Sequence, residues 1–179
     1  RTGLGVFNAN MATVGNFDVA KKLLIKGMFA TLHKHYSVDE IGGFLKSCRV
    51  ENIPLDNLFI TIGLKNIDSE IEKLKELESK YQWVSPRNIC IDAPNFYIQK
   101  ALDILARIRQ EFSDAVIMAG NIASGDICLK LLDYADIIKC GIGSGSACLT
   151  RKQTGCGTPM VSLVVECADI AHSVNGHIC

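Results

Sequence analysis

The sequence predicts an α/β fold, a (β/α)8 TIM barrel of which this chain holds about six to seven βα units, and two observations lead to this prediction. Short apolar runs rich in β-branched residues alternate with stretches of helical period, at intervals of about 20 to 30 residues, the length of one βα unit. Polar or glycine-rich groups follow almost every apolar run, and in a barrel such loops converge on one face to form a site. An open doubly wound sheet shows the same alternation but uses mainly its switch point, so the strand ends favour the barrel.

Six buried parallel strands are predicted, and a seventh begins at His177. They are the segments 5–10, 28–33, 58–63, 88–92, 115–119 and 136–141. No composition shift or low-complexity linker separates them, so residues 1–179 are expected to form a single, partial barrel domain. The chain has no initiating Met and ends abruptly at Cys179, so we expect truncation at both ends and an absent eighth unit.

Two helix starts carry capping signals. Ser37-Val-Asp-Glu40 is a capping box, in which the hydroxyl and the carboxylate satisfy backbone amides of the first turn. Ser124-Gly-Asp126 is expected to begin the helix after the fifth strand, because its hydroxyl and carboxylate can accept hydrogen bonds from free backbone amides.

Composition narrows the class of protein. The 179 residues are 48% hydrophobic and carry 19 basic and 19 acidic side chains, so there is no electrostatic footprint for nucleic acid or an anionic membrane, and a small-molecule substrate is expected. No apolar run approaches the roughly 20 residues of a spanning helix, and residues 1–5 do not resemble a secretory signal. The eight cysteines form no CxxC pair, which is typical of a reducing, cytoplasmic setting.

The segment from Lys139 to Arg151 is the most informative, because it places glycines, serines and a cysteine directly after a buried strand. Glycines let backbone amides face a phosphate, or carbonyls face a monovalent cation, and Ser146 adds a hydroxyl donor. Cys148 lies in this polar loop near Arg151 and Lys152, a setting that lowers a thiol pKa and exposes a nucleophile. A glycine-rich turn with an incidental thiol fits the spacing equally well, since glycine loops are weak signals.

Two charged residues close other strands. Lys34 lies between His33 and His35 after the second strand, where a phosphate or cofactor contact is favoured over a solvated lysine. Asp92 ends an apolar strand, where a carboxylate must be paired or functional. No third ligand at metal spacing supports a zinc site at the two histidines.

Several of these stretches together resemble one known family. The segments 143–151, 152–155 and 166–172 are similar to the active-site loop and following helix of the IMP dehydrogenase and GMP reductase family. His33-Lys-His-Tyr-Ser37 resembles the second-strand motif of the reductase branch. The match continues in order through the segments 10–15, 91–97 and 120–121, and no regulatory domain is inserted.

This resemblance implies an NADPH-dependent deamination of GMP. Cys148 would attack C2 of the guanine ring, ammonia would leave, and hydride from NADPH would yield IMP. Thr150 matches the proton-relay threonine of the family, which works beside a glutamate that lies beyond the end of this chain.

The resemblance also implies the ligand contacts and the assembly. Ser146 would bind the nucleotide phosphate. Potassium would be held by the carbonyls of Gly143, Gly145 and Cys148, with Arg151 nearby. NADPH would contact the residues Lys34, Asp92, Ala93, Ile142 and Gly143. Members of the family assemble as tetramers, so a homotetramer is expected.

Two alternatives stay open. One is IMP dehydrogenase, which shares the cysteine adduct but oxidises IMP with NAD; the other is a catalytically inactive barrel fragment. The sequence also departs from the family pattern at Ala12, Ser144, Leu149 and Phe96. Phe96 stands where a glycine is usual, so it is expected to restrict the backbone of the cofactor loop.

Overall fold

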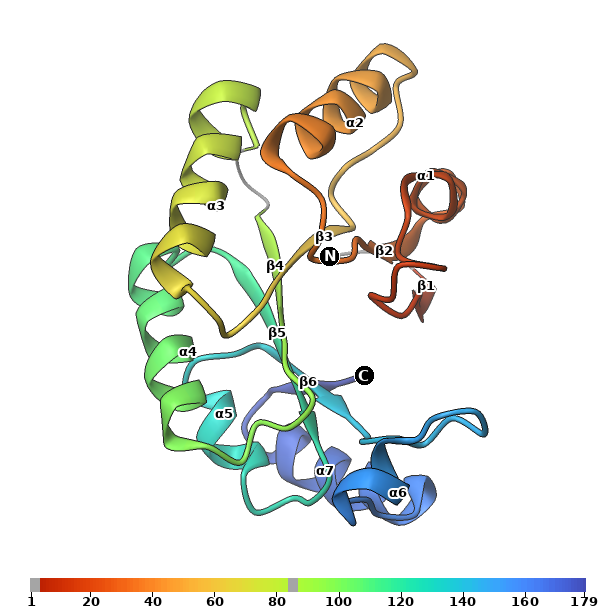
Figure 1. Cartoon of the computed structure of the whole chain (residues 1–179), viewed down its shortest axis with the longest axis vertical. Helices are drawn as coiled ribbons and strands as arrows, with labels where there is room; N and C mark the ends of the chain where they lie inside the picture. The colour runs from red at the N-terminus through yellow and green to blue at the C-terminus, as the bar shows by residue number, and fades with distance from the viewer. Residues whose placement is uncertain (1–3, 84–86) are drawn as a thin grey trace. The chain divides into compact units, whose positions relative to one another are not determined.

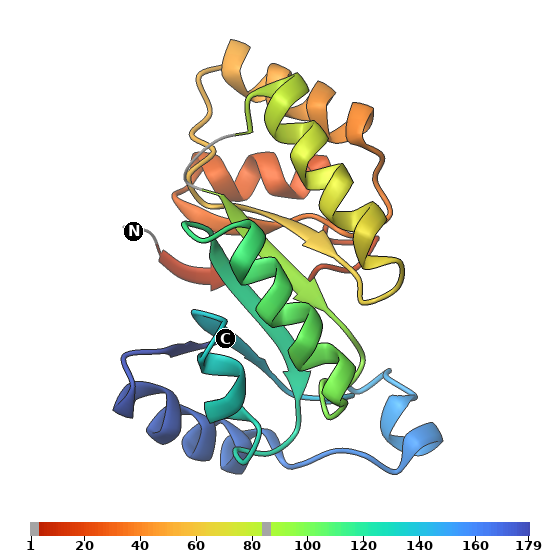
Figure 2. The ribbon, with the colours of Figure 1, turned by 90° about the vertical axis from the view of Figure 1, so that its left-hand side faces the viewer.

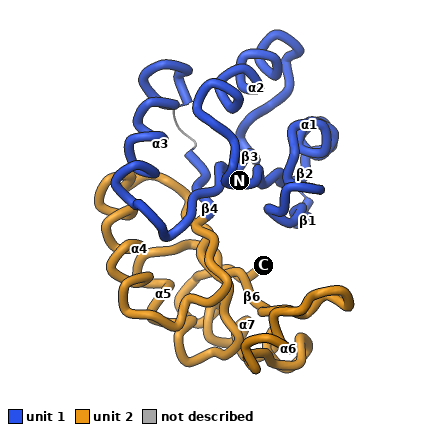
Figure 3. The backbone as a smooth tube through the Cα atoms, in the orientation of Figure 1, with its two compact units in different colours: residues 1–90 blue, residues 91–179 orange. Residues whose placement is uncertain are grey.

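The computed structural model describes residues 4–83 and 87–179, which form two compact units, Arg1–Cys90 and Ile91–Cys179 (Figure 3). Each unit is described by itself. The prediction of a single domain therefore stays a prediction. The segment 1–5 was compared with a secretory signal, and its residues 1–3 lie outside the described part. None of the helices in the described ranges is both long and apolar enough to cross a bilayer.

The first unit alternates strands and helices (Figure 1). Its elements are β1 (Leu4–Phe7), α1 (Phe17–Ile25), β2 (Met28–Thr31), α2 (Val38–Val50), β3 (Leu58–Ile62) and α3 (Ile67–Tyr81). The strands β1, β2 and β3 are parallel and follow one another in sequence order, with Ala30 of β2 in register with Leu58 of β3.

The second unit continues the alternation. Its elements are the end of β4 (Asn88–Asp92), α4 (Gln99–Glu111), β5 (Val116–Ile122), α5 (Cys128–Leu132), β6 (Ile137–Cys140), α6 (Thr150–Thr154), α7 (Met160–Ser173) and β7 (His177–Ile178). Strands β5, β6 and β7 are parallel and again follow sequence order, with Gly120 in register with Lys139. Figure 2 shows α4, α5 and α7 side by side, covering one face of these strands.

The strand order within each unit confirms the predicted fold class. A doubly wound sheet reverses its strand order at a switch point, whereas a (β/α) barrel adds each parallel strand next to the previous one. Both units follow the second rule, and the described residues contain seven strands. The fold is therefore an incomplete (β/α) barrel.

The apolar pattern explains why these segments become strands and helices. All five residues of β3 are buried, as expected for a parallel strand covered on both faces. In α3 the buried residues include Ile71, Leu74 and Leu77, the one face that a helical period of apolar residues produces. Burial of these side chains away from water is the main favourable contribution to folding.

One of the two predicted helix starts is confirmed, and the other is right only for its carboxylate, since Asp126 accepts hydrogen bonds from the backbone amides of Asp126 and Ile127. Ser37 and Glu40 form the capping box of α2, with both side chains bonded to backbone amides. Helix α5 begins only at Cys128 and has no side-chain cap. The hydroxyl of Ser124 instead hydrogen-bonds the carboxylate of Asp126, so this hydroxyl does not cap the helix.

Asn8, one of the polar residues that follow a predicted strand, connects two strand ends through hydrogen bonds to the backbone. Its amide nitrogen donates to the carbonyl of Thr31 at 2.9 Å and to that of Val14 at 3.0 Å, while its oxygen accepts from the Thr31 amide at 2.8 Å. Asn8 thereby fastens the end of β1 to the end of β2.

Helices α2 and α3 pack closely because α2 has a glycine at the contact. A Cβ added at Gly42 would lie 2.3 Å from Cζ of Tyr81. The Tyr81 ring is held in place, since its hydroxyl donates to Asp39 at 2.6 Å and Lys46 Nζ lies 4.9 Å from the ring centroid. The next residue, Gly43, is exposed and has no such neighbour within 4 Å.

We expect Gly42→Ala and Gly43→Ala to change stability in opposite directions. Overpacking against Tyr81 costs about 1 to 3 kcal/mol, only partly offset by the better helix propensity of alanine. At Gly43 the propensity gain acts alone and raises the free energy of unfolding by up to about 1 kcal/mol. Urea denaturation of the two variants checks this, and equal shifts for both would contradict the packing described for Gly42.

Candidate active site

The loop between β6 and α6 carries the predicted nucleophile. Figure 1 shows it extending away from the strands of the second unit, and residues 144–149 are exposed. Two of its glycines have backbone angles that favour glycine, with φ of +113° at Gly141 and +60° at Gly143. The loop can adopt this path because those positions carry no side chain.

Arg151 fastens the base of this loop. Its Nε donates to the carbonyl of Ile142 at 2.8 Å, and its Nη2 donates to the carbonyl of Thr158 at 2.6 Å. A Cβ at Gly143 would lie 2.9 Å from Cγ of Arg151, and one at Gly157 would lie 2.4 Å from its Nε. The two glycines therefore provide the room in which the guanidinium reaches both carbonyls.

Cys148 is exposed and paired with Thr150. Its Sγ lies 3.2 Å from Oγ1 of Thr150. Hydrogen bonds from the hydroxyl and the backbone amide of Thr150 lower the pKa of the Cys148 thiol, and the charge of Arg151 adds a smaller effect. The sequence led us to expect cations as the cause, but the guanidinium points to the two carbonyls it binds, so the Thr150 hydrogen bonds are more important.

Other thiols of the second unit behave in the opposite way. Cys128 and Cys167 are fully buried, and Cys140 is half-buried. Burial raises the pKa of Cys128 to about 12 and also raises the pKa values of Cys140 and Cys167. A thiolate is the reactive form of cysteine, so Cys148 has the properties of a nucleophile and the buried three have those of core residues.

The phosphate and cation candidates lie in the same loop. Ser146 is exposed, and the carbonyl of Gly145 accepts a hydrogen bond from the Cys148 amide at 3.0 Å. A carbonyl has two lone pairs, so the Gly145 oxygen can still bind a cation. Gly143 is half-buried and Gly145 is exposed, and neither has a side chain that could cover its own carbonyl. Within the described ranges, no cluster of three or more His, Cys, Asp and Glu side chains could hold a metal.

Asp92 is paired with a lysine that the sequence analysis did not assign. Lys139 Nζ, from β6, lies 2.9 Å from Oδ1 of Asp92 at the end of β4. The neighbouring Ala93 is buried, with its amide bonded to the Gly120 carbonyl and its carbonyl bonded to the Asn121 amide, each at 2.9 Å. Ala93 therefore fixes the strand end on which the Asp92 carboxylate is presented.

The structure brings most of the predicted site residues into the second unit. Ile142 and Gly143 lie at the start of the loop that carries Cys148, and Ile142 is buried. Lys34 belongs to the first unit, where it follows β2 and its carbonyl accepts a hydrogen bond from Lys73 at 3.3 Å.

Polar residues of the loops after β4 and β5 form a cluster that the sequence analysis missed. The Tyr97 hydroxyl donates to the Asp126 carboxylate at 2.8 Å and contacts the hydroxyl of Ser124. Burial raises the pKa of Tyr97, and the hydrogen bond from Ser124 lowers the pKa of Asp126. Glu166 of α7 also accepts a hydrogen bond from the Gly125 amide at 3.0 Å. No sequence periodicity predicts these contacts. The lysine that pairs with Asp92 could have been noticed, because Lys139 is a charged residue within an apolar strand.

The expectation that Phe96 restricts the backbone of its loop stays a prediction. Its side chain is fully buried, and its amide donates to the Asn121 carbonyl at 3.0 Å. Phe96 is absent from the residues with positive φ, so the backbone conformation there does not require glycine. The aromatic ring is part of the core. The other departures, Ala12, Ser144 and Leu149, are exposed and nothing in the structure opposes them.

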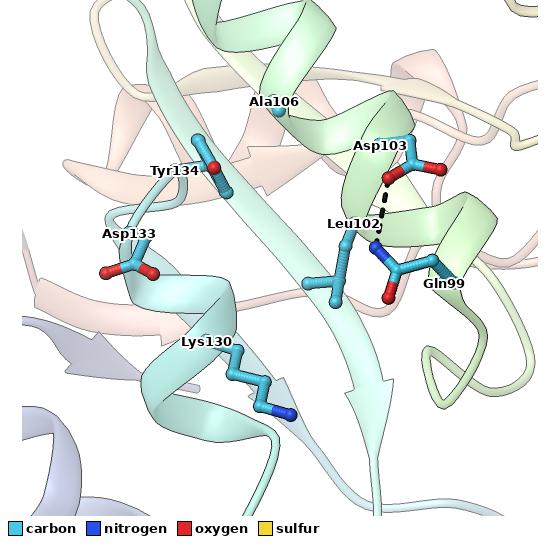
Figure 4. A pocket seen from close by; sticks show the side chains of 7 residues that line it. All are labelled: Gln99, Leu102, Asp103, Ala106, Lys130, Asp133 and Tyr134. Atoms are coloured by element: carbon cyan, nitrogen blue, oxygen red, sulfur yellow. Dashed lines mark hydrogen bonds between the residues drawn. The ribbon is translucent and has the colours of Figure 1, made fainter.

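A pocket of about 220 Å³ lies elsewhere, on the outer surface between α4 and α5 (Figure 4). Gln99 and Asp103, which are hydrogen-bonded at 3.0 Å, line one side, and Lys130 and Tyr134 line the other. None of the predicted site residues lines it. The loop after β6, and not this groove, is therefore the candidate active site.

Comparison with known proteins agrees with this choice. A sequence profile described as the IMP dehydrogenase / GMP reductase domain matches residues 3–179. The chain is 40% identical over 178 residues to a GMP reductase of Onchocerca volvulus, which covers 98% of this chain and 48% of the relative. GMP reductases of Vibrio parahaemolyticus and Caenorhabditis elegans are also 40% identical over 178 residues, covering 99% of this chain and 49% and 48% of the respective relatives.

The chain thus spans about half the length of the curated relatives it matches. The profile match nevertheless runs from residue 3 to the last residue, across both compact units. On this match, the chain belongs to the IMP dehydrogenase / GMP reductase family.

Proposed function

We propose that this protein catalyses the NADPH-dependent reductive deamination of GMP to IMP and ammonia. The observation that carries the proposal is the exposed Cys148 thiol, whose pKa is lowered by Thr150, in a glycine-rich loop directly after a strand. The names of the relatives, which are GMP reductases, support the choice of reaction and of substrate.

Cys148 is the nucleophile of the proposed mechanism. Its thiolate adds to C2 of the guanine ring, and the C2–N bond breaks as the amino group takes up protons and leaves as ammonia. NADPH, when bound, supplies the hydride that reduces C2. The C2–S bond then breaks, so that IMP is released and the thiolate is restored. Covalent catalysis of this kind divides one difficult displacement into two easier steps.

Thr150 acts on the thiol and on the leaving group. Its hydroxyl lies 3.2 Å from Sγ of Cys148, where it stabilises the thiolate before attack. The same hydroxyl can pass a proton toward the departing amine, because a hydroxyl is both a donor and an acceptor.

The remaining loop residues bind the substrate and a cation. Ser146 donates its hydroxyl to the nucleotide phosphate. The carbonyls of Gly143, Gly145 and Cys148 bind potassium, and Arg151 keeps the loop in place through its bonds to Ile142 and Thr158. A bound cation would order a loop that is otherwise exposed on most of its length.

In this proposal, NADPH is bound by charged side chains and by backbone groups. Asp92 accepts hydrogen bonds from the cofactor, and Lys34 contacts one of its phosphates. The cofactor is also contacted by Ala93, directly after β4, and by Ile142 and Gly143, at the start of the loop after β6. We further propose that the protein works in the cytoplasm as a homotetramer.

The proposal predicts that NADPH is oxidised only when GMP is present. The loss of NADPH absorbance is the measurement, with IMP and NAD as the parallel arm. Reduction of NAD in that arm, without NADPH oxidation in the first, would indicate an IMP dehydrogenase. No change in either arm would contradict an enzymatic role.

Cys148→Ala should abolish turnover while GMP still binds. Removal of the nucleophile is expected to lower kcat by on the order of 10³-fold or more. The matched control is Cys156→Ala, which removes another exposed thiol a few residues away and should leave kcat within about twofold. Calorimetric titration with GMP checks binding, and normal turnover of Cys148→Ala would exclude this thiol as the nucleophile.

Thr150→Val should shift the pH profile of Cys148 alkylation to higher pH. The Thr150 hydroxyl lowers the pKa of Cys148, so without it the thiolate fraction at neutral pH falls and alkylation by iodoacetamide slows. The backbone amide of Thr150 remains, so part of the effect persists. Site-resolved mass spectrometry follows the reaction, with Ser144→Ala, in the same exposed loop, as control. An unchanged midpoint would mean that the hydroxyl does not act on the thiol.

A further inference from the structure

The ion pair between Asp92 and Lys139 crosses a strand of the second unit. Lys139 extends from β6 and Asp92 ends β4, while β5 pairs with β6 between Met118 and Ile122. The two charged groups are 2.9 Å apart, and their side chains are only 17% and 19% exposed. A contact this short and this well shielded from water holds both side chains in one orientation.

Gly120 of β5 provides the space for this contact. It is in register with Lys139, and a Cβ added there would lie 2.5 Å from Cβ and 2.6 Å from the carbonyl oxygen of Lys139. Any larger residue would displace Lys139 from its path toward Asp92. Because Gly120 has no side chain, the Lys139 side chain can extend past β5 to Asp92.

Stability alone is a weak explanation for this pair. A shielded ion pair often contributes little net stability, because removing both charges from water offsets their attraction. The end of β4 is already fixed to β5 by the two backbone hydrogen bonds of Ala93. What the lysine adds is the orientation of the Asp92 carboxylate itself.

The position of Lys139 also connects two parts of the candidate site. It is followed by Cys140 and then by Gly141, where the loop that carries Cys148 begins. Lys139 therefore lies two residues before the start of the nucleophile loop, and its side chain contacts the carboxylate at the end of β4.

We propose that Lys139 is a positioning residue that presents the Asp92 carboxylate to the donor groups of the pyridine dinucleotide. This inference rests on the proposed function, in which Asp92 accepts hydrogen bonds from NADPH. Lys139 acts through Asp92: it compensates the carboxylate charge and fixes the orientation in which the carboxylate meets the cofactor.

The test measures NADPH binding by the single and double variants. Binding is detected by the fluorescence of the cofactor, in the absence of GMP. Lys139→Met should raise the dissociation constant about tenfold, the loss expected for one well-oriented charge-assisted hydrogen bond. Asp92→Asn should have a similar effect, and the double variant should be no weaker than either single variant, because both changes remove the same interaction. Lys139→Arg should restore most of the affinity.

Turnover provides a second readout that a general loss of structure would not reproduce. In Lys139→Met the KM for NADPH should rise while the KM for GMP and the pH midpoint of Cys148 alkylation stay unchanged. If Lys139→Met does not fold, the double variant, which leaves no unpaired charge, is compared with Asp92→Asn instead.

The outcomes separate the two proposals. Failure of the unsubstituted protein to bind NADPH would overturn the proposed function and this inference with it. Binding of NADPH that is equal in the unsubstituted protein and in Lys139→Met would overturn the positioning role alone. A further loss on adding Lys139→Met to Asp92→Asn would also overturn it, since Lys139 would then act independently of Asp92.

Discussion

The conformation of the candidate site depends on the hydrogen bonds from the Arg151 guanidinium to the carbonyls of Ile142 and Thr158. These bonds connect the start of the exposed loop to the segment that precedes α7. They also explain part of the glycine pattern, because Gly143 and Gly157 leave the room that the arginine side chain occupies. With the base of the loop fixed in this way, Cys148 can be exposed while its Sγ stays 3.2 Å from Oγ1 of the half-buried Thr150.

The fold could be predicted because its signals are local and repeat along the chain. Each βα unit contains one apolar strand and one helix with a buried face, so an error in one unit does not change the class. The capping box at Ser37 was also predictable, since it depends on residues three positions apart. Ser124 was misassigned because its hydroxyl has two competing partners, Asp126 in the same loop and Tyr97 in a different loop.

The site could be predicted only in part. Cys148 was recognisable from its place in a polar loop after a strand, but the main cause of its lowered pKa is a neighbouring hydroxyl, which no charge pattern reveals. The lysine paired with Asp92 lies 47 residues away in the sequence. Phe96 could be noticed as a departure from the family pattern, but its burial could not be predicted; in the structure its ring is fully buried.

The contacts of Tyr97 with Asp126 and of Glu166 with the Gly125 amide have a mechanical consequence. They tie together the loop after β4, the loop after β5 and helix α7, three segments that the chain connects only through other elements. Displacement of any one of them strains hydrogen bonds made by the others, so the three respond to a load as one body. In the second unit these cross-linked segments therefore contrast with the loop after β6, of which residues 144–149 are exposed.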